Sequence, residues 1–209
     1  MVLAGAAVGV GGWLIQSGTR TSAPPLPSAA DAWPGLPLPT PRTTQPGPGS
    51  EAVGMAFSKP VRIRIPRIDV DAPIAEVDLD ANGNLPAPSA VDRRLAGWYE
   101  QSAAPGTSGN AVIDGHVDTL DGPAVFYSLG ALHRGDTIDI IRADRSTAEF
   151  TADAIEVYPK GAVPADRVFG AAEQPQLRLI TCGGTYTKAT GYQGTVVVYG
   201  HLARAVPAP

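Results

Sequence analysis

Short runs of alternating or consecutive apolar residues recur over residues 61–204. Residues 61–65 (VRIRI) alternate apolar and charged side chains, which is the period of a half-buried strand. Further extended runs, separated by turn signals, cover residues 68–74, 97–99, 111–113, 137–142, 148–157, 178–182 and 194–202. Because no segment keeps a helical period beyond about three turns, we predict an all-β barrel or sandwich with only short helices, as over residues 123–132.

The amino-terminal segment is uncharged and rich in glycine. As a helix, residues 2–15 would span about 21 Å, which is short of the roughly 30 Å bilayer core. We interpret residues 1–18 as an apolar membrane anchor or signal-like segment, and a start codon placed too far downstream would explain its shortness. A buried helix is the alternative, which the glycines disfavour.

A proline-rich stretch separates this segment from the predicted strands. Residues 21–60 hold ten of the 21 prolines and few large apolar side chains. Such a composition buries too little surface to offset the entropy lost on ordering, and proline stiffens it toward polyproline II. We predict that residues 19–60 form a disordered linker. It is either a spacer that holds a folded domain, residues 61–205, away from a membrane, or merely a disordered tail.

Composition and charge narrow the possible partners. Apolar residues make up 44% of the chain, which is enough for a core, and the formal net charge of −4 gives no basic face for nucleic acid. A single cysteine excludes an internal disulfide bond. In an exported protein, an unpaired cysteine indicates a reactive thiol or an intermolecular partner, whereas in a cytosolic protein it would mean little.

The single cysteine, Cys182, follows a predicted strand and precedes Gly183 and Gly184. An extended backbone holds the sulfur in place. The two glycines let a substrate chain come close and offer N–H groups to a developing oxyanion. The alternative is a small buried residue ahead of a turn, since free cysteine is among the most buried residue types.

His116 is the best candidate partner for this thiol. It follows the apolar strand 111–113, 66 residues before Cys182. If the two strands are neighbours that run the same way, both side chains reach one rim, where a thiol and an imidazole can perform acyl transfer. We expect His133, beside a turn, to be solvated and His201, at the end of the last strand, to be structural.

Two short stretches resemble parts of metal-binding sites. Residues 78–84 (DLDANGN) resemble the start of a calcium loop, but position twelve is Ser89 rather than glutamate, so we read Asn82-Gly83 as a hairpin turn. His116 and Asp118 have a two-ligand spacing, yet a zinc site would need one or two more ligands from few remaining histidines. We therefore predict no metal or cofactor, and we expect Asp118 to orient His116 or a loop backbone.

Five sequence motifs, spread over most of the predicted domain, resemble those of a known protein family. They are IRIPRIDVDAPI (63–74), GWY (97–99), PGTSGNAVIDGHVDT (105–119), FYSLGALHRGD (126–136) and LRLITCGG (177–184). With these motifs, residues 61–204 resemble a sortase, specifically the class F type found in actinobacteria. The resemblance implies an eight-stranded β-barrel outside the cell, tethered to the membrane through the amino terminus. It also implies a monomer without a cofactor.

The same resemblance implies the reaction. It makes the protein a cysteine transpeptidase that cleaves a Leu-Pro-x-Thr-Gly sorting signal of surface proteins between Thr and Gly. Cys182 would be the nucleophile that holds the acyl group. His116 would be the general acid, and then the base for an incoming amine from a cell-wall precursor.

One departure from the family pattern concerns the oxyanion. Sortases place an arginine on the strand after the cysteine strand, but residues 194–201 contain none, and Thr195 or Gln193 stands near the expected place. Arg178 shares a strand face with Cys182 but lies about 13 Å back along it. Lys188, in the loop after the cysteine strand, could swing in but lacks the guanidinium fork.

Three outcomes follow from this departure. The loop supplies the charge, the backbone N–H groups at Gly183 carry more of the stabilisation, or the enzyme is slow or inactive. Two other functions stay open beside transpeptidation. One is a hydrolytic thiol peptidase, and the other is a non-catalytic barrel that binds peptides or cell-wall material.

Overall fold

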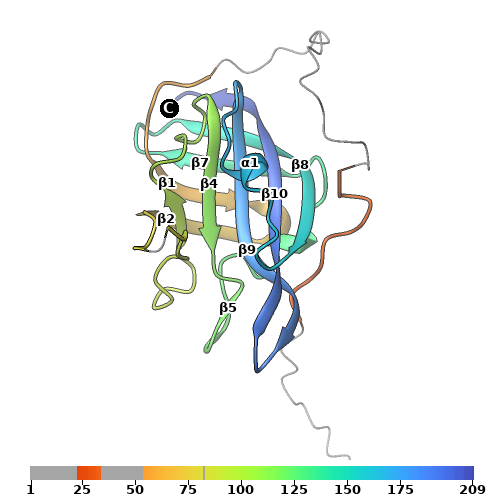
Figure 1. The fold of residues 1–209 in the computed structure, drawn as a ribbon. Helices are drawn as coiled ribbons and strands as arrows, with labels where there is room; N and C mark the ends of the chain where they lie inside the picture. Colours follow the sequence, from red (N-terminus) through yellow and green to blue (C-terminus); the bar gives the residue numbers. More distant parts are fainter. Residues whose placement is uncertain (1–22, 34–53, 82) are drawn as a thin grey trace, which may run out of the picture.

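The computed structural model describes residues 23–33, 54–81 and 83–209, and its main feature is a closed barrel of eight strands (Figure 1). The strands are β1 (Pro60–Ile65), β2 (Val70–Val77), β3 (Ala96–Tyr99), β4 (Gly109–Gly115), β7 (Thr137–Arg142), β8 (Thr147–Pro159), β9 (Pro175–Thr187) and β10 (Gly191–Val206). Their order around the barrel is β1-β2-β3-β4-β9-β10-β8-β7, and β7 closes the barrel by pairing with β1. The predicted all-β, eight-stranded barrel is confirmed.

The other elements are short, as predicted. A two-stranded sheet pairs β5 (Asp118–Thr119) with β6 (Gly122–Pro123). In the part of the chain that the structure describes, the helices are two 3-10 turns, η1 (Pro66–Ile68) and η2 (Leu129–Ala131), and one α-helical turn, α1 (Ala165–Val168). The β2–β3 and β4–β9 pairs are parallel, and the other barrel neighbours are antiparallel.

The connection from β2 to β3 corrects the predicted hairpin at residues 82–83. Because β2 and β3 are parallel, their connection must cross back over the barrel end and cannot be a hairpin. A local turn does exist there, since the Gly83 N–H donates to the Asp80 carbonyl at 2.9 Å and Gly83 has φ +79°. Asn82 lies outside the described residues.

Alternation along β9 gives its two faces different roles. Leu177 and Leu179 point into the barrel and are buried in the main core with Trp98, Phe126 and Phe150. On the other face, Ile180 packs in a second cluster on the outside of the barrel, with Val112, Ala154, Val168, Val197 and Tyr199. In Figure 1, α1 lies in front of β9 and β10 and covers this cluster.

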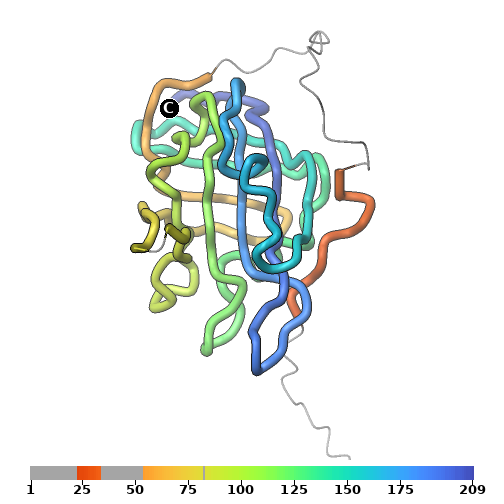
Figure 2. Tube along the Cα trace, in the orientation of Figure 1, coloured from red at the N-terminus to blue at the C-terminus, as the bar shows by residue number. Residues whose placement is uncertain are grey.

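Residues 23–33 pack on the barrel, which corrects the prediction of a disordered linker for this part of residues 19–60. The Asp31 carboxylate accepts a hydrogen bond from Nδ1 of His133 at 2.7 Å, and the Trp33 N–H donates to Glu156 Oε1 at 2.8 Å. The Trp33 ring lies edge-on to Tyr199, with centroids 6.1 Å apart. Figure 2 shows this segment beside the barrel.

The other predictions for the amino terminus concern residues that the structure does not describe. The predicted anchor, residues 1–18, and most of the predicted linker lie outside the described residues. Within residues 23–33, 54–81 and 83–209, no helix has both the length and the apolar character needed to cross a membrane.

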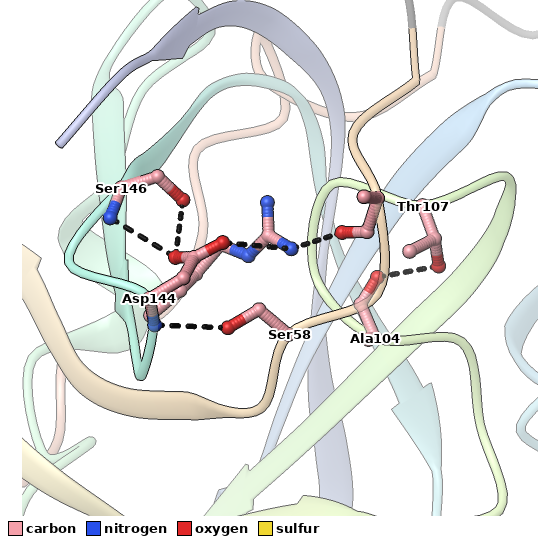
Figure 3. Close-up of polar contacts among 7 residues, drawn as sticks. Ser58, Ala104, Thr107, Asp144 and Ser146 are labelled. Carbon is pink, nitrogen blue, oxygen red and sulfur yellow. Dashed lines mark hydrogen bonds and ion pairs between the residues drawn. The ribbon is translucent and has the colours of Figure 1, made fainter.

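A small polar cluster fixes the chain where it enters the barrel (Figure 3). The buried Arg142 donates to the Ala56 carbonyl and lies 3.7 Å from the Asp144 carboxylate. Asp144 also accepts from the Ser146 hydroxyl at 2.6 Å, and its N–H donates to Ser58 at 3.1 Å. These contacts hold the segment before β1 against the turn between β7 and β8.

Candidate active site

Cys182 lies on the outer face of the barrel, between β4 and β10. The alternation along β9 places Thr181 inward, where it is buried, and leaves Cys182 exposed. Thr195 of β10 pairs directly with Cys182 in the antiparallel register. The thiol is therefore reachable from solvent, while the pairing with β10 holds its backbone in place.

The strands that carry His116 and Cys182 are parallel neighbours. β4 pairs with β9 with Asp114 opposite Ile180, and the same register continued by two residues brings His116 alongside Cys182. Thr181 Oγ1 donates to the Gly115 carbonyl at 2.7 Å, one residue before each of them. This is the strand arrangement that a shared rim requires. The catalytic roles of His116 and Cys182 stay predictions.

The ring of His116 is held by the connection between β2 and β3. Its Nε2 lies 2.8 Å from the carbonyl oxygen of Pro88. Because a carbonyl can only accept, Nε2 carries the hydrogen, and in the neutral ring Nδ1 is then the basic nitrogen. Within the described residues, the ring makes no hydrogen bond to the Cys182 thiol.

A groove of about 910 Å³ opens over the outer face of β4 and β9 and includes Cys182. From Gly109 to Asp114 its floor follows β4 over about 17 Å, the length of some five extended residues. Most of the larger side chains that line it are apolar, namely Leu79, Leu85, Tyr99, Val112, Val163, Phe169 and Ile180. Such a surface suits an extended peptide with apolar side chains.

Charges in the groove act on the thiol in opposite directions. Desolvation by the surrounding protein raises the pKa of Cys182 above its usual value, because the thiolate loses part of its hydration even though the residue is open to solvent. The carboxylates of Asp114 and Asp118 raise this pKa further, while Lys160 lowers it. At neutral pH, the isolated site therefore favours the thiol over the thiolate.

Asp114 is a groove residue that the sequence analysis missed. It lies on the floor beside Ile180, and burial raises its pKa to about 7, against a smaller opposing effect of the Gly115 N–H. The sequence did contain a signal for it: an acidic residue directly follows the apolar residues 111–113. A carboxylate in a buried strand is unfavourable, and such residues are often functional.

Arg178 and Lys188, the two cations considered from sequence, lie away from the thiol. Arg178 is buried, with its guanidinium 4.8 Å from the Tyr199 ring centroid and its Nε donating to the Arg167 carbonyl at 3.0 Å. Lys188 lies in the turn between β9 and β10, about 20 Å along the strand from Cys182. Neither residue lines the groove.

Of the remaining auxiliary candidates, Thr195 lines the groove. The Gln193 side-chain amide is turned back onto its own hairpin, where Nε2 donates to Thr190 Oγ1 at 2.8 Å. Asp118 accepts a hydrogen bond from the Tyr192 hydroxyl at 2.5 Å. The observed partner of Asp118 is thus Tyr192, in place of the expected His116 ring.

Gly183 and Gly184 are needed for packing and backbone geometry. A Cβ on Gly183 would lie 2.7 Å from Val196 Cγ2, inside the barrel, and Gly184 has φ +78°. Neither glycine lines the groove, so the shape of the groove does not support the predicted role of Gly183 and Gly184 in substrate binding. In the described part of the chain, no group of three or more His, Cys, Asp and Glu side chains is arranged to hold a metal ion.

Comparisons with known proteins identify the family and the fold. The Sortase domain family model matches residues 63–203. Sortase A from Corynebacterium diphtheriae is 25% identical, and the match covers 70% of this chain and 61% of that one, with a TM-score of 0.52. The chain therefore spans less than two thirds of that relative's length.

Two further solved structures share the fold. Pilus-related sortase C of group B Streptococcus is 22% identical over 73% of this chain and 70% of its own, with a TM-score of 0.53. Sortase A of Listeria monocytogenes is 16% identical over 73% and 92%, with a TM-score of 0.54. No curated protein matches the chain.

Proposed function

The chain belongs to the sortase family, and on that premise we propose that it is a cysteine transpeptidase whose nucleophile is Cys182. The observation that carries the proposal is the position of Cys182. The thiol opens into an apolar groove and lies on a strand that runs parallel to the strand leading to His116. In this arrangement an extended peptide in the groove would pass directly over the sulfur.

The proposed reaction has two halves. The Cys182 proton passes to the His116 imidazole, and the thiolate attacks the scissile carbonyl, so that an S–C bond forms and the carbonyl oxygen becomes an oxyanion. The oxyanion collapses, the C–N bond breaks, and the imidazolium gives its proton to the departing amine. An acceptor amine then attacks the thioester, loses its proton to His116 and releases the Cys182 thiol.

The substrate class is part of the proposal. We infer a Leu-Pro-x-Thr-Gly sorting signal cleaved between Thr and Gly, a cell-wall amine as acceptor, and a class F enzyme tethered outside the cell. The groove supports the apolar part of such a signal through Val112, Val163 and Ile180. The motifs IDGHVDT and LITCGG support the class.

A second candidate is a sortase-like domain that binds peptides with little turnover. Two observations favour it: the Cys182 pKa is raised, and none of the described residues that line the groove is an arginine. Loss of one oxyanion donor typically lowers the rate about 10²–10³-fold. A third candidate, a thiol peptidase that hydrolyses the thioester, differs only in the final acceptor.

Mass spectrometry separates these functions. The full chain is incubated with a panel of sorting peptides, with and without a glycine amine, and Cys182→Ala is the control. Transpeptidation predicts an acyl adduct on Cys182 and a ligated product that requires the amine. A hydrolase gives the same free acid with or without amine. A binding domain gives no adduct, and turnover by Cys182→Ala would refute the proposed nucleophile.

A further inference from the structure

The groove contains one basic side chain. Among the described residues that line it, Lys160 is the only lysine, arginine or histidine. The oxyanion of acyl transfer needs a donor or a positive charge near the sulfur. Since Arg178 and Lys188 lie outside the groove, Lys160 is the cation that the fold brings to the thiol.

Two features hold the backbone of Lys160 in place. Its N–H donates to the Gln193 carbonyl at 2.8 Å, on the strand next to β9. Lys160 is also the second residue of a tight turn, in which the Ala162 N–H donates to the Pro159 carbonyl at 2.9 Å and Gly161 has φ +78°. The base of the side chain is therefore fixed before any substrate binds.

The strand register places Lys160 close to the row of residues that contains Cys182. Tyr158 of β8 pairs with Thr195 of β10, and Thr195 pairs with Cys182 of β9, so the three form one row across the outer face. Lys160 is two residues beyond Tyr158 and lines the same groove as Cys182. β8 lies two strand spacings, about 10 Å, from β9, and the offset of two residues adds about 7 Å along the strand, so only a long side chain such as lysine can extend toward the sulfur.

The ammonium group is available for a ligand. It forms no hydrogen bond or ion pair with another residue of the described chain, in contrast to Lys59, which pairs with Glu76 at 2.7 Å. Its charge already acts on the sulfur, because Lys160 lowers the pKa of Cys182.

We propose that Lys160 is the active-site cation of this protein, and that its ammonium donates a hydrogen bond to the oxyanion formed when Cys182 attacks the scissile carbonyl. The assignment rests on the transpeptidase function proposed above. The ammonium keeps its proton throughout, because proton transfer belongs to His116. Lysine provides a compact charge without the bidentate fork of arginine, so it would serve the oxyanion and leave the substrate backbone to other groups.

The test uses the full chain and single-turnover formation of the Cys182 thioester. Lys160→Met removes the charge and keeps the apolar stem, and Lys160→Arg keeps the charge. Lys59→Met is the matched control, because Lys59 directly precedes β1, which lies across the barrel from β9. We expect thioester formation to slow about 10²-fold in Lys160→Met, to stay within about tenfold in Lys160→Arg and to be unchanged in Lys59→Met.

A second readout reports the charge without turnover. The pH dependence of iodoacetamide alkylation gives the thiol pKa, which we expect to rise in Lys160→Met and to stay near its original value in Lys160→Arg.

Other outcomes would overturn the assignment. Normal thioester formation in Lys160→Met, or an equal loss in Lys188→Met, removes Lys160 from the role and leaves the proposed function standing. A full chain that forms no thioester with any sorting peptide overturns the function and the role of Lys160 together.

Discussion

The hydroxyl of Thr181 donates a hydrogen bond to the carbonyl oxygen of Gly115 at 2.7 Å, and this contact joins the two strands of the candidate site. Thr181 is the residue before Cys182, and Gly115 is the residue before His116. The backbone pairing of β4 and β9 ends at Asp114 and Ile180, so the side chain of Thr181 extends the connection between the strands to the rim.

Thr181→Val should therefore weaken both stability and catalysis. The buried Gly115 carbonyl would lose a partner, which costs about 1–3 kcal/mol of unfolding free energy. We expect kcat to fall more than KM changes, because the spacing of His116 and Cys182 loosens while the apolar groove remains. Denaturant unfolding and steady-state kinetics measure the two effects. Thr181→Ser keeps the hydroxyl and should restore both; failure of this rescue would argue against the hydrogen bond.

Asp114 should make stability depend on pH. Burial raises its pKa in the folded state to about 7, above the ordinary value of 3.8, so the folded state binds the proton more tightly. Its contribution is present at low pH and is lost as the pH rises through about 7. We expect Asp114→Asn to gain about 2 kcal/mol over the unmodified chain between about pH 5 and about pH 8, measured by urea unfolding. A constant difference would contradict the assigned pKa.

Asp114 should also slow the reaction of the thiol. Its carboxylate raises the pKa of Cys182, and so does Asp118 to a smaller extent. We expect Asp114→Asn to increase the rate of iodoacetamide alkylation of Cys182 several-fold near neutral pH. Removal of the nearby negative charge lowers the pKa of the thiol and so raises the fraction of reactive thiolate. Asp118→Asn should have a smaller effect. Equal rates in Asp114→Asn and the unmodified chain would place the carboxylate outside the electrostatic reach of the sulfur.

The contact between Asp31 and His133 should control the docking of residues 23–33. Hydrogen bonds from the Arg134 N–H and from His133 hold the pKa of Asp31 below 3.8, so its contribution is present above that pH and is lost as the pH falls through the lowered value. We expect Asp31→Ala to cost about 1–3 kcal/mol of docking free energy.

Limited proteolysis of residues 23–33, together with Trp33 fluorescence, tests this docking. Cleavage should be faster in Asp31→Ala than in the unmodified chain, while the barrel stays intact. Asp69→Asn, an exposed change on the turn after η1, is the control and should leave cleavage unchanged. Equal cleavage in Asp31→Ala would mean that the Trp33 contacts suffice to hold the segment.

Two parts of the structure differ from what local sequence suggested. Arg178 was considered because it shares a strand face with Cys182, and Lys188 because it lies in the loop after the cysteine strand, but neither residue lines the groove. Arg178 is on the right strand and is buried against Tyr199. Composition likewise predicted disorder for residues 23–33, but one carboxylate and one indole find specific partners on the barrel.

Local order along the chain was enough to predict most of the strands, and to single out His116, which follows β4, and Cys182, which lies within β9. These features depend on the two-residue period of an extended backbone, which neighbouring residues alone express. Only the folded barrel decided which groups surround the sulfur. Lys160 and Asp114 reach the groove because β8, β10, β9 and β4 lie side by side, and pairing between segments far apart in the chain leaves no local pattern in the sequence.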